Sequence, residues 1–198
     1  MTEKERRKAR EMKYLSIASK LKQDAGVEHH FPLKWYSDPL PPGAGGFAET
    51  WHKFDGVPVG AIWAPEGKTL PQLFIVAHEC GHCAHRHSLQ IKGGMGEDRF
   101  DRTLFHSTRE YEANKWAFDS LTRHGISLPK RMDIRWRIDV MNLCEEEKLG
   151  FTDLSSGIRE FIEPLLRHGC KYNPHSDEPI WHTLEYVLFE KYGPVAHS

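Results

Sequence analysis

The chain has 198 residues and lacks several features that would assign it to a large functional class. No apolar run approaches the roughly 20 residues of a membrane span, so we expect no membrane-spanning segment. Neither a GxxxxGK(S/T) nor a GxGxxG pattern is present, and no phosphate-binding loop is expected. The formal net charge of -1 gives the whole molecule no field that would select nucleic acid or an anionic membrane.

Cysteine is also scarce. Two of the four residues lie three positions apart, too close to pair easily within a helix: Cys80, Cys83, Cys144 and Cys170. A structural zinc site built on this CxxC would need two more ligands, and no second CxxC supplies them. We therefore expect reduced thiols and a cytoplasmic protein. The first residues are rich in Lys, Arg and Glu without a hydrophobic core, so we do not expect a secretory signal there.

Histidine, in contrast, is abundant, with 13 residues, several of them around an HExxH sequence at residues 78–82. Residues four apart lie on one face of a helix, so His78 and His82 can present two imidazole nitrogens to one metal ion. Glu79 would then project beside the metal and hold a water, as a general base rather than as a ligand.

The sequence around this motif predicts a helix. Thr69 followed by Gln72 is a capping-box pattern, and Pro71 falls in the first turn, where its missing N–H costs little. Small residues in the stripe that follows would let another element approach closely. The stripe has a period near 3.6 and consists of Leu73, Ala77, Cys80, Gly81 and Ala84.

A third metal ligand must come from elsewhere, because catalytic zinc sites usually have three protein ligands and one open position. We expect a second helix from Thr108 to about His124, begun by Ser107, in which Glu110 could reach the metal. Asn114, one turn later, could bond the outer nitrogen of a ligand histidine. We expect Glu112 to point away from the metal. The alternative is that Ser107 to Glu110 forms a capping box and Glu110 serves only as a helix cap.

These motifs carry a resemblance that covers residues 45–129. The HExxH helix, the segment from Glu110 to Ala117 and the segment Gly125–Pro129 resemble the ImmA/IrrE-type metallopeptidases, within the gluzincin group. The resemblance implies an α+β, zincin-like core with a small sheet against the HExxH helix. It also implies Glu110 as third zinc ligand and a peptidase activity. Characterised members of that family cleave phage or stress-response repressors, so a repressor is the implied class of substrate.

The remaining sequence predicts a three-part organisation: 1–30 as a basic helix, 31–129 as the metallopeptidase core and 130–198 as a helical extension. Residues 1–22 carry eight Lys/Arg and three Glu, a net charge of +5. This helix, expected over 2–25 and ended by Gly26, either contacts nucleic acid or has a solvated face, and the second interpretation is favoured.

Between the helices we expect a linker, a hairpin and a loop. Residues 31–46 form the linker, Asp55-Gly56 turns the hairpin 47–63, and 90–103 form the loop. Pro58 predicts that the second strand of the hairpin lies at a sheet edge, where an extended peptide could add to it. The extension is expected to hold helices at about 130–149, 153–168 (kinked at Pro164) and 177–191.

The sequence therefore predicts a zinc-dependent metalloendopeptidase that acts on a protein or peptide. An alternative is a catalytically weak zincin-like module that contacts a regulatory protein or DNA. Candidates for a side chain that stabilises the oxyanion are Tyr111, His106, His124 and His175. Four other histidines are expected at the surface: His29, His30, His85 and His87.

Overall fold

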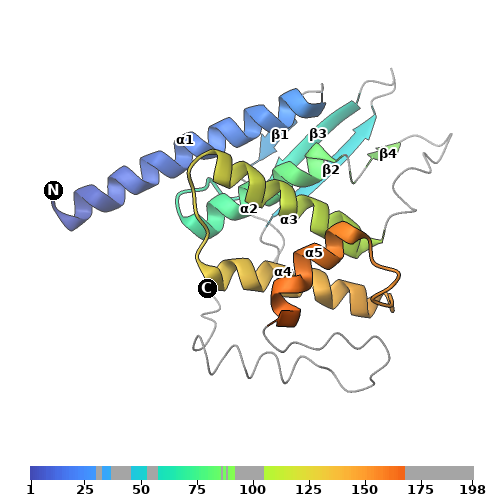
Figure 1. Ribbon diagram of the computed structural model, residues 1–198. Helices are drawn as coiled ribbons and strands as arrows, with labels where there is room; N and C mark the ends of the chain where they lie inside the picture. The colour runs from blue at the N-terminus through green and yellow to red at the C-terminus, as the bar shows by residue number, and fades with distance from the viewer. Residues whose placement is uncertain are drawn as a thin grey trace. The chain divides into compact units, whose positions relative to one another are not determined.

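A computed structural model describes residues 1–29, 33–36, 46–52, 58–85, 87, 89–91 and 105–167 (Figure 1). Two compact units divide the chain. Unit 1 comprises Met1–Phe105 and Glu112–Ser127, and unit 2 comprises His106–Tyr111 and Leu128–Ser198. The described residues form five helices and one sheet of four strands, an α+β combination in which helices predominate.

Unit 1 begins with helix α1, Glu3–His29, opened by a capping box in which Thr2 and Glu5 bond each other's backbone N–H groups. The predicted end at Gly26 is wrong, because the helix continues through this glycine for another turn. Residues 1–10 are all exposed, whereas Leu21 and Ala25 are completely buried. The C-terminal half of α1 thus anchors the helix in the core of unit 1.

The sheet has the order β1-β3-β2-β4. Its strands are β1 Leu33–Tyr36, β2 Phe47–His52, β3 Pro58–Trp63 and β4 Leu89–Ile91. Strands β2 and β3 pair antiparallel, which confirms the predicted pairing of the hairpin, while Asp55-Gly56 lies outside the described residues. Two strands were not predicted, since β1 and β4 have only four and three residues, too few to display an alternating pattern.

The prediction that the second hairpin strand lies at an edge is wrong. Strand β3 is interior, with β1 paired parallel on one side and β2 antiparallel on the other. Pro58 is tolerated because it is the first residue of the strand, and β1 pairs only with Gly60–Trp63. In the described part of the sheet, β1 and β4 are the outer strands.

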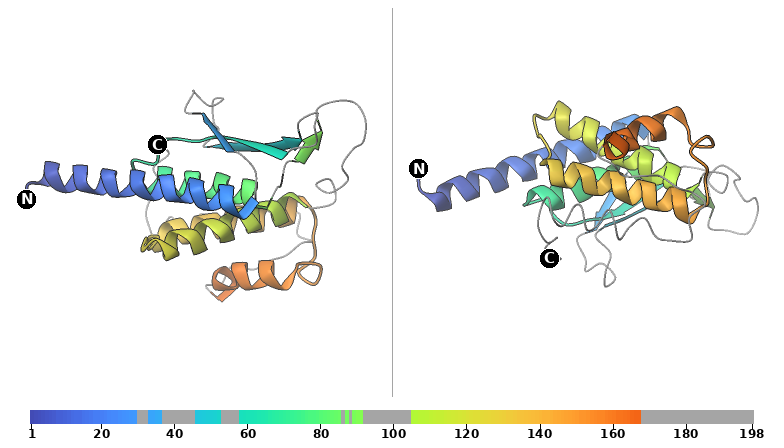
Figure 2. Two further views of the ribbon diagram at one scale, coloured as in Figure 1. Left: turned by 90° about the horizontal axis from the view of Figure 1, so that it is seen from above. Right: turned by 60° about the horizontal axis from the view of Figure 1, so that its bottom comes forward.

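Helix α2, Leu70–Ala84, carries the HExxH sequence and begins as the sequence predicts. The hydroxyl of Thr69 accepts a hydrogen bond from the N–H of Gln72 at 3.4 Å, and Gln72 Oε1 accepts one from the N–H of Lys68 at 3.1 Å. The sheet lies on one side of α1 and α2, and α3 lies on the other (Figure 2). Accordingly α2 is buried on nearly all sides, including His78 and Glu79.

Helix α3, His106–Arg123, approaches α2 almost backbone to backbone. A Cβ atom on Gly81 would lie 2.7 Å from the carbonyl oxygen of Ala113 and 2.8 Å from its Cα. Real Cβ atoms essentially never come so close, so the small residues predicted to allow a close approach do so here. The helix ends before Gly125, whose φ of 69° favours glycine.

Unit 2 contains α4, Lys130–Glu146, and α5, Ser156–Arg167, close to the predicted positions. Pro164 lies inside α5. The aromatic ring of Tyr111, on the part of α3 that belongs to this unit, packs edge-on against Phe161 with 5.3 Å between centroids. The predicted helix 177–191 and Cys170 lie outside the described residues. No described helix has the length and hydrophobicity needed to cross a membrane.

Candidate metal centre

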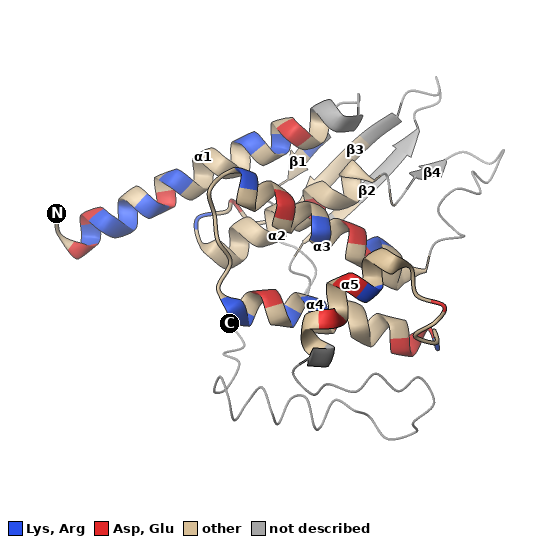
Figure 3. Ribbon diagram, viewed as in Figure 1, with Lys and Arg blue, Asp and Glu red and all other residues tan. Residues whose placement is uncertain are grey.

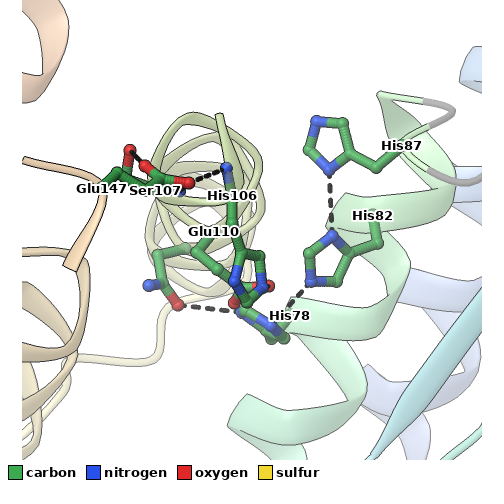
Figure 4. Close-up of polar contacts among 8 residues, drawn as sticks. His78, His82, His87, His106, Ser107, Glu110 and Glu147 are labelled. Carbon is green, nitrogen blue, oxygen red and sulfur yellow. Dashed lines mark hydrogen bonds and ion pairs between the residues drawn. The ribbon is translucent and has the colours of Figure 1, made fainter. Parts of the chain in front are cut away.

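Two imidazoles of α2 converge at the centre of the HExxH sequence. The Nε2 atoms of His78 and His82 are 3.0 Å apart, and their rings are nearly perpendicular, at 88° (Figure 4). Two nitrogens that bind one tetrahedral zinc at about 2.0–2.1 Å are about 3.3 Å apart, so this spacing suits a pair of ligands. His78 is buried, with 7% of its surface exposed, so little water can reach its ring nitrogens in place of a metal ion.

Glu110 of α3 is the third residue of a group that could hold a metal ion. His78, His82 and Glu110 each offer one ligand atom, and these atoms all lie within 4.8 Å of one another. Two histidines and one glutamate are a donor set that catalytic zinc sites use. The structure therefore brings together three residues that could hold a metal ion.

Asn114 orients the first of these histidines. Its Oδ1 lies 2.9 Å from His78 Nδ1, and its side chain is 1% exposed. Because an amide oxygen only accepts, His78 must carry its proton on Nδ1 to make this bond. Nε2, which lies 3.0 Å from His82 Nε2, then keeps the lone pair that metal binding requires.

His87 lies against the second histidine, and its predicted place at the surface is wrong. It is 1% exposed, and its Nδ1 is 2.9 Å from His82 Nδ1 while its Nε2 is 2.7 Å from Glu112 Oε2. The backbone N–H of His87 bonds the carbonyl of His82 at 3.0 Å, so the turn after α2 folds this residue back over the helix end. Helical periodicity does not extend beyond the end of α2, and therefore gave no sign of this contact.

Glu112 does not point away from the site as predicted. Its carboxylate bonds His87 and lies 4.0 Å from Nδ1 of His85, which stays exposed as predicted. The hydrogen bond from His87 lowers the pKa of the Glu112 carboxyl, against the opposing effect of partial burial. The prediction considered only the angular position of Glu112 on its helix. Because α2 and α3 lie close together, the long side chain of Glu112 still reaches His87.

Glu79 is buried beside the sheet, with 5% of its surface exposed. A Cβ atom on Gly46, the residue before β2, would collide with the Glu79 carboxylate and lie 2.7 Å from its Cγ. The same atom would lie 2.8 Å from Cγ2 of Ile75. The absence of a side chain at Gly46 therefore makes room for the glutamate.

The capping-box alternative for Glu110 is wrong. Helix α3 begins two residues earlier than expected, and Phe105 at its N-cap makes no side-chain cap bond. The start of the helix is capped instead by Glu147, which accepts hydrogen bonds from the backbone N–H groups of His106 and Ser107 and from the Ser107 hydroxyl (Figure 4). Ser107 is therefore not the N-cap residue of α3.

One of the four candidates for stabilising an oxyanion lies beside a site residue. His106 Nε2 is 3.2 Å from Glu110 Oε1. Tyr111 packs on Phe161, and His124 Nε2 lies 3.1 Å from Asp24 Oδ2. His175 lies outside the described residues. Of the described candidates, His106 is thus the best placed.

The cysteines of the described residues are buried thiols. Burial raises the pKa values of Cys80 and Cys83 well above their ordinary range, and that of Cys144 to about 11. Thiols with such pKa values stay protonated at neutral pH and are weak nucleophiles. Neither group of residues able to hold a metal in the described part of the chain contains a cysteine.

Comparison of the chain with protein-family models, curated proteins and solved structures finds no match in any of the three. The resemblance to ImmA/IrrE-type metallopeptidases therefore stays a prediction from the motifs. The assignment of a function depends on the geometry of the residues themselves.

Proposed function

We propose that this chain is a zinc-dependent metalloendopeptidase with a zincin-like core. The observation that carries the proposal is the convergence of His78, His82 and Glu110, whose ligand atoms lie within 4.8 Å of one another. Their chemistry fits zinc better than magnesium or calcium, which prefer oxygen ligands alone. The orientation of His78 by Asn114 gives further support, since ligand histidines usually donate their other N–H to an oxygen.

The residues around the metal group divide the work of peptide hydrolysis. Zinc in such a site supplies Lewis acidity, which polarises a carbonyl and lowers the pKa of water to roughly 7. Glu79, adjacent in sequence to a ligand and not itself part of the group, takes a proton from water and returns it to the leaving amine. Its burial beside Gly46 keeps its carboxylate in one place. His106 is the proposed donor to the developing oxyanion.

The proposed substrate is an extended segment of a protein. Since β3 is interior, the peptide would add to an outer strand. Of the two outer strands, β4 is the nearer in sequence to the HExxH helix. Leu89, where β4 begins, follows two residues after His87, which contacts the ligand His82. The motif resemblance favours a transcriptional repressor in the cytoplasm as this substrate.

The test compares wild type with Glu79→Gln, and with Glu160→Gln as a control at an exposed position of α5. Zinc-loaded proteins are incubated with unfolded protein and with candidate repressors, and cleavage is followed by mass spectrometry. Glu79→Gln should retain zinc and melting temperature but cleave about 10²–10⁴ times more slowly, the usual cost of losing a general base. Equal cleavage by wild type and Glu79→Gln would contradict the proposed chemistry.

The N-terminal part of α1 favours a second candidate function. Residues 1–10 are all exposed, and Lys and Arg dominate there (Figure 3). The fold could therefore serve as a catalytically weak module that contacts an acidic protein or DNA through α1. Metal binding without any hydrolysis, together with salt-dependent DNA binding that is lost when Arg6, Arg7 and Arg10 become Glu, would favour this second function.

A further inference from the structure

The buried ring of His87 uses both of its nitrogens. Nδ1 lies 2.9 Å from His82 Nδ1, and Nε2 lies 2.7 Å from Glu112 Oε2. With 1% of its surface exposed, His87 has no contact with bulk water that could replace either partner. The three side chains form a continuous chain, which we call the His82–His87–Glu112 chain.

The hydrogen-bonding capacity of a neutral imidazole determines the direction of this chain. One ring nitrogen donates and the other accepts. If His82 binds a metal through Nε2, its proton is on Nδ1 and is donated to Nδ1 of His87. His87 then carries its own proton on Nε2 and donates it to the carboxylate of Glu112. Every donor in the chain has an acceptor, and the lone pair of His82 Nε2 faces His78.

The same residues also belong to the second group that could hold a metal, His85, His87 and Glu112. A metal bound by His87 through Nε2 would remove the proton that this nitrogen gives to Glu112. The proton of His87 would then be on Nδ1, directed at His82, and His82 would have to carry its own proton on Nε2. In that state the Nε2 atom of a neutral His82 has no lone pair to bind a metal. A metal in the second group therefore excludes a metal bound by His78, His82 and Glu110.

We propose that His87 and Glu112 are positioning residues that hold His82 in its metal-binding tautomer. The protein therefore binds one metal ion rather than two. The inference depends on the proposed function, because it takes His82 as a ligand. His78 and His82 would thus be oriented by different means, the first by Asn114 and the second by a histidine–glutamate pair. Such supporting residues typically contribute 10–100-fold to metal affinity, as an order of magnitude.

The test titrates metal-free protein with Co²⁺ and follows the visible absorption of the bound ion, with Zn²⁺ affinity measured by competition with a chelator. His87→Ala and Glu112→Ala should bind roughly 10–100-fold more weakly, and the Co²⁺ spectrum of His87→Ala should differ from wild type because His82 can reorient. Glu112→Gln should bind nearly as tightly as wild type, because its amide oxygen still accepts the proton of His87. His85→Ala, a change at the exposed member of the second group, is the matched control and should have no effect.

Several outcomes would overturn the inference. Two Co²⁺ ions per wild-type chain, one of them lost in His85→Ala and in Glu112→Gln, would make the second group a metal site of its own. Wild-type metal affinity and a wild-type Co²⁺ spectrum in both His87→Ala and Glu112→Ala would show that His87 and Glu112 do not orient His82. If His87→Ala fails to fold, the result for Glu112→Ala tests the inference instead. The side chain of Glu112 is 32% exposed, so this variant should fold, and circular dichroism can check that it does.

His82→Ala separates this inference from the proposed function. If His82→Ala binds metal as tightly as wild type, the metal centre itself is wrong. If His82→Ala loses metal while His87→Ala and Glu112→Ala do not, the inference alone fails.

Discussion

At the scale of single residues, the position of the Glu79 carboxylate is limited by a glycine far from it in sequence. Gly46 immediately precedes β2, and any Cβ atom there would overlap the Glu79 side chain. The same Cβ atom would also lie 2.8 Å from Cγ2 of Ile75, so two side chains crowd this position. A proton acceptor works only within hydrogen-bond reach of its water, so small displacements of Glu79 should be costly.

We therefore predict that Gly46→Ala impairs hydrolysis without impairing metal binding. The added methyl group must displace Glu79 or Ile75, and none of the three atoms nearest to it belongs to His78, His82 or Glu110. Cleavage should fall by about 10²-fold, as for a misplacement of about 1 Å, with zinc content unchanged. Ala48→Gly, a change at a buried position in the adjoining strand β2, is the control for damage to that strand. Equal cleavage by Gly46→Ala and wild type would contradict the packing argument.

A second prediction at this scale concerns the thiols of Cys80, Cys83 and Cys144. Burial raises the pKa of Cys144 to about 11 and raises the pKa values of the other two. At pH 8 their thiolate populations are small, because a raised pKa favours the protonated form. Iodoacetamide should leave all three unlabelled in the native protein and label them in denaturant, as peptide mapping can establish. Rapid labelling of native Cys83 would contradict its burial.

At the scale of elements, α3 is held at its first turn by a residue of α4's end. Glu147 follows α4 and accepts from two backbone N–H groups that the helix itself leaves without partners. Its carboxylate also suits the positive end of the helix dipole. The turn that it caps leads directly to Glu110.

We predict that Glu147→Ala destabilises the protein by about 0.5–2 kcal/mol, the usual cost of losing a helix cap. Zinc affinity should also fall, since fraying of the first turn would reach Glu110. Thermal melts and chelator competition measure the two effects. The control is Glu146→Ala, at the exposed neighbouring position, which should change neither. A normal zinc affinity in a destabilised Glu147→Ala protein would show that this helix cap does not affect zinc binding.

The elements that the sequence predicts are those determined by neighbours in the chain. Thr69, Gln72 and the spacing of His78 and His82 all act within a few residues, and they correctly predict the start of α2 and the convergence of its two histidines. The contacts of Gly46, His87 and Glu147 depend on segments that meet only in the folded chain. No local pattern marks such contacts, so Gly46, His87 and Glu147 were missed, whereas Asn114, one turn after Glu110 on the same helix face, was predicted.

At the scale of the whole molecule, the two units are not successive in sequence. Unit 2 takes His106–Tyr111 from within the range that otherwise belongs to unit 1. No single break in the chain can therefore separate the two units. A fragment that starts at Leu128 would lack the turn that Glu147 caps, and we expect it to be less stable than the corresponding part of the full chain.

Metal removal should lower the melting temperature of the full chain. A ligand that binds only the folded state, present at 100 times its dissociation constant, contributes about 2.7 kcal/mol. For a chain of this size that corresponds to a shift of about 5–10 °C. Calorimetry with and without a chelator measures the shift, which should disappear in His78→Ala. A chelator effect of equal size in that variant would place the stabilising ion elsewhere.

The pairing of the sheet has a consequence for the order in which the protein folds. Strands β2 and β3 pair antiparallel across a short connection, but both outer strands pair parallel with distant partners, Leu33 with Gly60 and Thr50 with Leu89. Closing such long segments is slower than forming a hairpin. The hairpin should thus form first and act as the template on which β1 and β4 are added. Pulsed hydrogen exchange during refolding should protect the amides of β2 and β3 before those of Leu33–Tyr36, and early protection of β1 would reverse this order.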